Sequence, residues 1–321
     1  MLEKTRGILL RTGEMLDAYS VRAPDDHYER DIRSFLPRYA PMWLWHLHLS
    51  LRGQLDELES RFYLGLLKDR IVSNVSTWKS GPIGIVGHLF TDADQRGKGA
   101  CTELMKTAMD DFLSRGGKTL IGGFKLASCH IARRLGFKSV VDNCEVMRYD
   151  SAPDFVKTYF QAQKTRCRDA LWKDWPGISL LYTTRDGWNL RSIKHAISGP
   201  FDYEDYFLKD MRKRLKGLCK SKVLVTERDY IVGHATLNLS EPLGRKHWLL
   251  DMFVHPASLS QLDTMLDALD WPEDNVRCYV ETGLDEKRNA LQARGFREKG
   301  VSERRVKGKT LRTTLMELEA T

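Results

Sequence analysis

Apolar residues occur at two spacings in the first half of this chain. Ile83–Phe90 is a short apolar run that contains glycine, which is typical of a buried strand. From Leu104 to Phe112 apolar side chains recur three and four positions apart, and Gly116 and Gly117 follow them. The pattern predicts a strand, a loop over 91–101 and an amphipathic helix.

The pattern continues beyond this helix, and an earlier segment has helical spacing. Thr119–Gly123 predicts a further strand, and Ala127–Leu135 predicts a helix that ends at Gly136 and Phe137. Residues 25–36 also have the spacing of a helix. The first half therefore alternates strands and helices, as an α/β domain does.

The second half of the chain repeats this order of elements. A hairpin, a strand, a helix, a strand and a helix are predicted at 223–239, 247–255, 261–269, 276–280 and just before Arg294–Phe296. The repeated order indicates two domains of similar architecture.

The predicted loop over 91–101 has the composition of a phosphate site. Gly97 and Gly99 allow the backbone to approach a ligand closely, and Arg96 and Lys98 add positive charge. The first turn of the following helix has unpaired N–H groups and the positive end of the helix dipole. We therefore predict that the loop holds a pyrophosphate group.

Two common phosphate motifs do not fit this loop. It lacks the G-x-x-x-x-G-K-[ST] sequence of a Walker A loop, and its G-x-G lacks the third glycine of a dinucleotide fingerprint. It resembles the acyl-CoA loop of the GNAT superfamily of N-acetyltransferases, R/Q-x-x-G-x-G/A, with Arg96, Gly99 and Cys101 at the marked positions. Cys101 departs from the glycine or alanine of the pattern. The Leu-Gly-Phe ending at 135–137 is also typical of the family, and the full resemblance covers residues 60–150.

The resemblance implies an α/β fold on mixed sheets. We expect two tandem GNAT-like domains, each a twisted mixed β-sheet flanked by helices. The expected boundaries are an acyl-CoA-binding domain over 1–150, a linker and helix over 151–177, and a degenerate domain over 178–321. Met42–Leu51 alternates like a strand, but the family has its early helices here, so we expect a helix.

The loop of the second half lacks the features of a phosphate site. When Val254 is aligned with Thr91, no glycine or basic residue remains in the loop. The positions of Arg96, Gly99 and Cys101 are taken, in this order, by Leu259, Leu262 and Thr264. We therefore expect only the first half to bind CoA.

The resemblance implies transfer of an acetyl or other acyl group from acyl-CoA to a primary amine, which attacks the thioester directly. By resemblance, the backbone from Phe90 to Asp92 binds the acyl group or the oxyanion. The implied cofactor-binding residues are Phe90, Thr91, Asp92, Arg96, Gly97, Lys98, Gly99, Ala100 and Cys101.

The strand before the loop offers few candidates for a general base. Family bases on this strand correspond to Ile85, Gly87 and Leu89, and none of these side chains can titrate. His88 has the opposite parity, so strand alternation predicts that it points to the other face. A core role and a catalytic role for His88 both stay open.

The general acid is equally open. Ala132 occupies the position at which the family often has a tyrosine. His130, on the same predicted helix, is our second catalytic candidate and would act through water; an ordinary exposed role is the alternative.

The composition is that of a globular protein, with 321 residues, 42% hydrophobic and 29% charged. No run of about 18 apolar residues is present, and the N-terminus lacks a signal-peptide pattern, so we expect a cytoplasmic protein without membrane contact. The six cysteines include no C-x-x-C pair, and His46 and His48 have no third ligand at a recognisable spacing. We expect no metal site.

The net charge of +8 allows anionic partners such as CoA without requiring one. The densest basic run, Lys209–Lys222, is interleaved with apolar residues at helical spacing and predicts a solvated helix face. Contact of this helix with RNA or an acidic protein is the alternative.

The sequence thus favours a GNAT-type N-acetyltransferase that uses acetyl-CoA and acts on a small-molecule amine. A homodimer is compatible with this expectation. Two other classes stay open: a non-catalytic acyl-CoA-binding protein, and a nucleic-acid-associated protein that uses 209–222. The sequence does not identify the acceptor, the acyl chain or the general base and acid.

Overall fold

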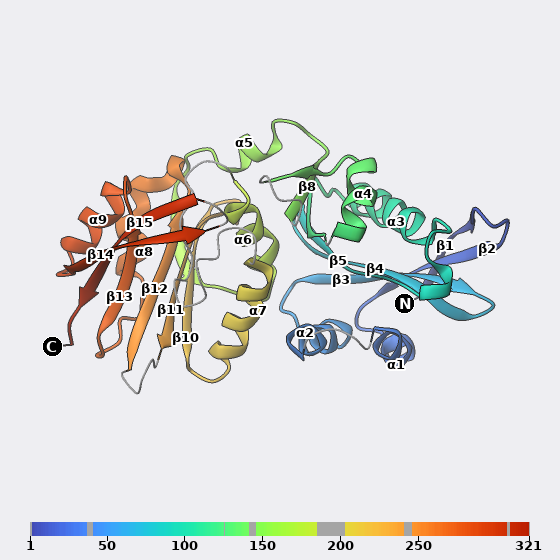
Figure 1. Ribbon diagram of the computed structural model, residues 1–321, viewed down its shortest axis with the longest axis horizontal. Helices are drawn as coiled ribbons and strands as arrows, with labels where there is room; N and C mark the ends of the chain where they lie inside the picture. The colour runs from blue at the N-terminus through green and yellow to red at the C-terminus, as the bar shows by residue number, and fades with distance from the viewer. Residues whose placement is uncertain are drawn as a thin grey trace. The chain divides into compact units, whose positions relative to one another are not determined.

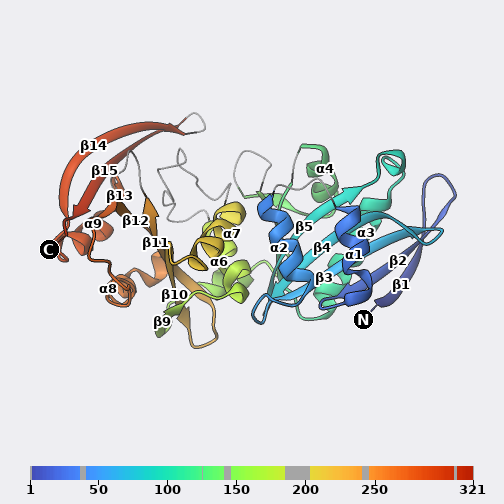
Figure 2. The ribbon, with the colours of Figure 1, turned by 90° about the horizontal axis from the view of Figure 1, so that it is seen from below.

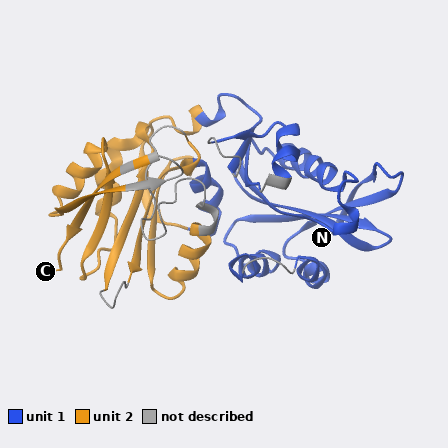
Figure 3. Cartoon of the chain, viewed as in Figure 1, with its two compact units in different colours: residues 1–156, 171–180 blue, residues 157–170, 181–321 orange. Residues whose placement is uncertain are grey.

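The computed structural model describes residues 2–36, 41–124, 126–140, 146–184, 203–240, 246–306 and 309–320. The chain forms two compact units, each built on one mixed sheet with helices, which confirms the predicted α/β fold (Figure 1). Unit 1 comprises 1–156 and 171–180, and unit 2 comprises 157–170 and 181–321 (Figure 3). The domain boundaries expected from the sequence, 150 and 178, stay a prediction.

Unit 1 contains an eight-stranded sheet in the order β1-β2-β3-β4-β5-β6-β8-β7. Neighbouring strands are antiparallel except for β5 and β6, which are parallel. The hairpin β1–β2 was not predicted. The strands are β1 Leu2–Leu9, β2 Met15–Arg22, β3 Glu59–Leu67, β4 Arg70–Ser80, β5 Ile83–Thr91, β6 Thr119–Gly123, β7 Lys138–Ser139 and β8 Val146–Asp150.

Helices cover both faces of this sheet (Figure 1). Helices α3 and α4 pack on one face, in a core that contains Val86 and Phe112. On the other face α1 and α2 pack against Phe62 and its neighbours, and α2 confirms the helix expected over 42–51. The helices are α1 Asp26–Phe35, α2 Pro41–Leu51, the 3-10 helix η1 Ala93–Gln95, α3 Ala100–Ser114 and α4 Leu126–Arg134.

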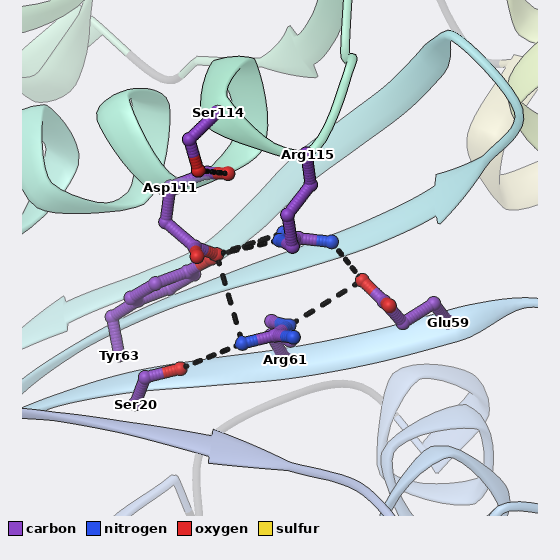
Figure 4. A network of polar contacts seen from close by, with 7 residues as sticks. All are labelled: Ser20, Glu59, Arg61, Tyr63, Asp111, Ser114 and Arg115. Atoms are coloured by element: carbon purple, nitrogen blue, oxygen red, sulfur yellow. Dashed lines mark hydrogen bonds and ion pairs between the residues drawn. The ribbon is translucent and has the colours of Figure 1, made fainter. Parts of the chain in front are cut away.

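A polar network ties the last turn of α3 to the sheet (Figure 4). Asp111 accepts hydrogen bonds from Tyr63 and from Arg115, whose Nη2 lies 2.8 Å from the carboxylate. Arg115 also pairs with Glu59, and Arg61 lies 3.4 Å from the same Glu59 carboxylate. Burial would raise the pKa of Asp111, but the bonds from Arg115 and Tyr63 outweigh it and lower this pKa. The network fixes the end of α3 opposite to the loop over 91–101.

Unit 2 contains a seven-stranded sheet in the order β14-β15-β13-β12-β11-β10-β9, with β12 and β13 as its one parallel pair in the described chain. Strand β9 lies where we expected a linker and a helix. The strands are β9 Thr165–Asp169, β10 Cys219–Thr226, β11 Ile231–Ser240, β12 His247–Val254, β13 Val276–Glu281, β14 Arg297–Val306 and β15 Lys309–Leu318.

Several short helices follow β8, and the longest of them, the 12-residue α7, packs against β10 (Figure 2). They are α5 Phe155–Tyr159, the 3-10 helix η2 Trp172–Asp174, α6 Trp175–Tyr182, α7 Tyr203–Arg214, the 3-10 helix η5 Pro256–Gln261, α8 Leu262–Asp267 and α9 Asp285–Gln292. The residues of η2 and the start of α6 belong to unit 1.

The prediction of one basic helix over Lys209–Lys222 is wrong. Helix α7 ends at Arg214, because Gly217 has a φ of 68° and the Leu218 amide closes the turn onto the Lys213 carbonyl at 3.0 Å. Lys220 and Lys222 lie on strand β10, where Lys222 is 2.8 Å from the Asp169 carboxylate. The basic run is therefore divided between a helix and a strand.

Two features are absent from the described residues. None of their helices has the length and hydropathy needed to cross a membrane. Nor do these residues bring together three or more His, Cys, Asp or Glu side chains that could hold a metal ion.

Candidate active site

A β-bulge interrupts strand β5 at His88. Strand β4 pairs Ser76 with Gly87 and then, after a register shift, Asn74 with Phe90, so two residues of β5 lie opposite one of β4. His88 has a φ of 48°, in the left-handed region. The Asn74 side-chain amide donates to the His88 carbonyl at 2.8 Å and holds the bulge in place.

The bulge changes which face the side chains of β5 occupy. The His88 ring lies 5.1 Å from that of Trp78, and a Cβ added to Gly87 would meet the same indole at 3.2 Å. Leu89 instead packs in the core beneath α3, and Phe90 packs on the α1 and α2 side. The prediction that alternation turns His88 away from the face of Gly87 is therefore wrong, because the bulge inserts one extra residue.

His88 lies in a cluster of aromatic rings. Its ring centroid is 5.6 Å from Trp43 and 6.4 Å from His46, both on α2. His46 in turn lies 5.8 Å from Trp172 and 4.8 Å from Trp175, in the segment 171–180. Burial lowers the pKa of His88 to about 3, and it lowers that of His46 well below its usual value. Both imidazoles are therefore neutral near pH 7.

Near the bulge, the edge of β5 that faces β6 is no longer paired with it in the described chain. The parallel ladder between β5 and β6 covers Ile83–Ile85 and Thr119–Ile121, and in the described chain it extends no further. The following part of β5, up to Thr91, thus presents a strand edge on the β6 side. An extended group with amide bonds could pair with such an edge.

The loop that follows β5 leads directly into α3. Gly97 and Gly99 have φ values of 78° and 102°, which a residue with a Cβ adopts only at a cost. A Cβ on Gly97 would meet no atom within 4 Å. Gly99 is the N-cap of the 15-residue helix α3 and has no side chain to cap its amides. The first amides of α3 are thus available to an anion.

The charged side chains of the loop also shape it. Arg96 Nε donates to the Thr91 carbonyl at 3.1 Å, across the loop. Lys98 Nζ donates to Gln95 Oε1 at 2.9 Å and lies 3.5 Å from the Glu14 carboxylate. The sequence did not indicate these partners, because it does not show that the hairpin β1–β2 reaches the loop.

Two further loop residues face back toward the sheet. Ala100 is buried in the core beneath α3. Burial raises the pKa of the Cys101 thiol to about 11, and a hydrogen bond with Thr91 offsets part of this rise. A thiol with this pKa is protonated at neutral pH, so Cys101 acts as a small filler of the first helical turn.

Asp92 pairs with Arg70 at 2.9 Å at the start of the loop.

The two predicted catalytic histidines are not brought together. His130 is exposed on α4, which packs with α3, whereas His88 faces α2 on the other side of the sheet. The sequence draws attention to His46, but it gives no reason to place Trp172 and Trp175 beside it. These two tryptophans are separated by Lys173 and Asp174, so no continuous apolar run marks them.

A cavity of about 470 Å³ lies between α1 and α2. Its lining includes Glu29, Arg33 and Leu44, and none of its described lining residues belongs to β5 or to the loop over 91–101. We therefore assign the candidate site to the bulge and the loop, not to this cavity.

Part of the chain is similar to a known protein family. Residues 25–137 match the model of the acetyltransferase (GNAT) family. This match contains α1, α2, the bulge and the whole loop. A comparison with curated protein sequences found no match.

Solved structures similar to the chain cover about half of it. The GNAT domain of S. lividans PAT is 12% identical, with 45% of this chain and 96% of that chain covered and a TM-score of 0.37. The ribosomal-protein-S5-alanine acetyltransferase from Vibrio fischeri is 14% identical over 50% and 96% of the two chains, with a TM-score of 0.36. The acetyltransferase yncA from Salmonella typhimurium, solved with acetyl-CoA, is 19% identical over 49% and 94%, with a TM-score of 0.36.

Proposed function

We propose that the chain transfers an acyl group from acetyl-CoA or another acyl-CoA to a primary amine, starting from the match of residues 25–137 to the acetyltransferase (GNAT) family. The observation that supports this proposal best is an order of three elements: the bulged strand β5, the loop with two glycines in the left-handed conformation, and the start of α3. We propose that one extended acyl-CoA molecule has its thioester at the bulge and its phosphates at the start of α3.

The residues of the loop fit the phosphates of CoA. The backbone at Gly97 and Gly99 leaves room for a ligand, and the amides at the start of α3 point to it. Arg96 and Lys98 add positive charge beside them. The open edge of β5 near Phe90 to Asp92 would hold the acyl end through its backbone.

When bound, acyl-CoA supplies the acyl group as a thioester. In the proposed transfer the amine nitrogen bonds to the acyl carbon as the carbon–sulfur bond breaks. The amine gives up one proton, and the sulfur takes one from solvent or a nearby acid. The task of the chain is to hold the two groups in line and to accept the amine proton.

We propose that His88 receives the incoming amine. Its imidazole is neutral at pH 7 and can accept a hydrogen bond from an N–H group. A base whose pKa is near 3 keeps no proton at pH 7, so the proton passes on to water. His130, exposed on α4, stays a prediction as a water-mediated acid.

A small-molecule acceptor agrees with the surroundings of His88. The side chain is only 6% exposed, and Trp43 and Trp78 lie against it. A compact amine can enter such a space more readily than a folded protein surface. We propose a small amine as the acceptor on this ground.

Calorimetric titration with acetyl-CoA tests the site. We expect one binding site per chain, lost in Gly99→Leu. Gly283→Leu is the matched control: Gly283 lies in unit 2, has a φ of 94° and also has open space at its Cβ. Loss of binding in Gly99→Leu alone supports the proposal, whereas equal affinity in Gly99→Leu and the wild type contradicts it.

A second assay separates an enzyme from an acyl-CoA-binding protein. A panel of primary amines is added to the protein with acetyl-CoA, and free thiol is measured over time. Amine-dependent thiol release above the rate of Gly99→Leu supports catalysis. Tight binding without release for any amine favours the non-catalytic alternative, with which the absence of a titratable side chain at Ile85, Gly87 and Leu89 also agrees.

A further inference from the structure

The tip of the hairpin β1–β2 is fixed against the phosphate loop. Leu10 is 4% exposed and belongs to the core beneath α3. The next amide, that of Arg11, donates to the Lys98 carbonyl at 3.1 Å, and Glu14 pairs with Lys98 at 3.5 Å. This hairpin precedes the segment 25–137 that matches the acetyltransferase family.

The Arg11 side chain runs along the start of α3. A Cβ placed on Gly99 would lie 3.9 Å from Arg11 Cγ and 4.0 Å from its Nε. Arg11 is exposed, and no carboxylate among the described residues pairs with it. Lys98, in contrast, is paired with Glu14. Arg11 is therefore a cation beside the N-cap of α3 whose charge no ion pair within the described chain neutralises.

The nearest acidic side chain on α3 does not oppose an anion there. Glu103, in the first turn, lies 2.7 Å from Lys106 Nζ and 3.7 Å from Arg6 Nη2. Arg6 also donates to the Glu103 carbonyl at 3.0 Å. The charge of Glu103 is thus balanced by two cations, and the start of α3 keeps its positive potential.

We propose that Arg11 binds a phosphate group of acyl-CoA together with the amides at the start of α3. The inference rests on the proposed function and extends the phosphate site to a hairpin outside the family match. A guanidinium can donate two parallel hydrogen bonds to phosphate oxygens, which a lysine cannot do. The group is either the pyrophosphate or the 3′-phosphate, since both have the same chemistry.

Calorimetric titration with CoA and with 3′-dephospho-CoA tests the inference. We expect Arg11→Ala to weaken CoA binding about tenfold, or about 1.4 kcal/mol, and Arg11→Glu to weaken it further. An equal loss for both ligands assigns Arg11 to the pyrophosphate. A loss seen with CoA alone assigns it to the 3′-phosphate.

The matched control is Arg30→Ala, which removes one positive charge from a side chain of α1 that is 91% exposed. We expect wild-type affinity for this variant. Wild-type affinity in Arg11→Ala would overturn the inference. If Gly99→Leu still abolished binding in that case, the proposed function would stand; if the wild type itself bound no CoA, the proposed function would fail.

Discussion

Units 1 and 2 have the same core topology but differ at the corresponding strand, loop and helix. In both, antiparallel strands lead to one parallel pair, β5–β6 in unit 1 and β12–β13 in unit 2. Strand β5 is bulged at His88, whereas β12 pairs with β11 from Val254 to His247 without a register shift. The two units thus share a topology but differ in the bulge that is part of the proposed acyl-CoA site.

The loops after β5 and β12 differ in their backbone. Gly99 begins α3 with a φ of 102°, but the aligned Leu262 has a φ of −58° and is already helical. His255 precedes the short helix η5 and accepts a hydrogen bond from the Ala257 amide at 3.2 Å. The His255 side chain therefore caps η5, the short helix that stands in unit 2 where unit 1 has its glycine-bearing loop. We propose on this basis that the second loop binds no CoA.

Of the variants that test this comparison of the two units, Trp175→Ala has the largest expected effect on stability. Its side chain is fully buried in unit 1, although it follows strand β9 of unit 2 along the chain. We expect Trp175→Ala to lower the free energy of unfolding by about 3–5 kcal/mol, because it leaves a large cavity. Hydrogen exchange measures where protection is lost: we expect β5 and α2 to lose it. Loss confined to β10–β13 would contradict the assignment of 171–180 to unit 1.

Acid should destabilise unit 1 through His46 and His88. Their pKa values are lowered in the folded state, so the unfolded chain binds protons more readily and stability falls as the pH drops below about 6.5. We expect His88 to contribute a loss of about 2 kcal/mol between pH 7 and pH 5, and His46 to add a loss in the same direction. Urea unfolding at several pH values measures it.

Two variants separate the contributions of these histidines. His46→Leu and His88→Asn should each flatten the pH dependence, and asparagine tolerates the left-handed backbone at 88. If both variants were as acid-sensitive as the wild type, the stability change would have to arise elsewhere.

A smaller effect is expected from the network at the end of α3. Asp111→Asn should lower the free energy of unfolding at pH 7 by about 1.5 kcal/mol, since it weakens charged hydrogen bonds from Arg115 and Tyr63. The pKa of Asp111 is lowered by folding, so this contribution is present above pH 4 and is lost as the pH falls further. Thermal unfolding at pH 7 and pH 3 checks the difference, and an equal deficit at both values would refute this explanation.

The smallest effect is expected from the corresponding helix of unit 2. Arg294 binds Asp263 and Asp267 of α8 at 2.7 and 2.5 Å, but both carboxylates are more than 70% exposed. Arg294→Ala should therefore cost less than about 1 kcal/mol. The same unfolding assay applies, and a loss as large as that of Asp111→Asn would remove this contrast between the two helix anchors.

The sequence predicted those elements of unit 1 in which the apolar side chains keep one regular spacing throughout. The apolar spacing of Leu104 to Phe112 required a helix, and the glycines after β5 indicated a loop with an unusual backbone. It did not predict the bulge at His88, because a bulge depends on pairing with Asn74, a residue 14 positions earlier. The face of His88 was therefore assigned incorrectly.

Contacts between residues far apart in the sequence also explain the other differences between the predicted elements and the structure. Strand β9 has a polar sequence that carries no strand signal, and only its pairing with β10 makes it a strand. Arg11 lies in the turn of the hairpin β1–β2, and the contact of this turn with Lys98 joins residues that are far apart in the sequence. The apolar spacing through Leu218 continues past the end of α7 at Arg214, and the positive φ of Gly217 is what ends the helix.

The chain passes three times between the two units, at 156–157, 170–171 and 180–181. Neither unit is thus a continuous segment of the chain. A single cut in the chain therefore cannot release either unit intact. A nascent chain must include the residues of β9 before Trp172 and Trp175 can emerge and join unit 1. Unit 1 therefore cannot finish folding from its own first 156 residues alone, although domains usually fold in order from the N-terminus.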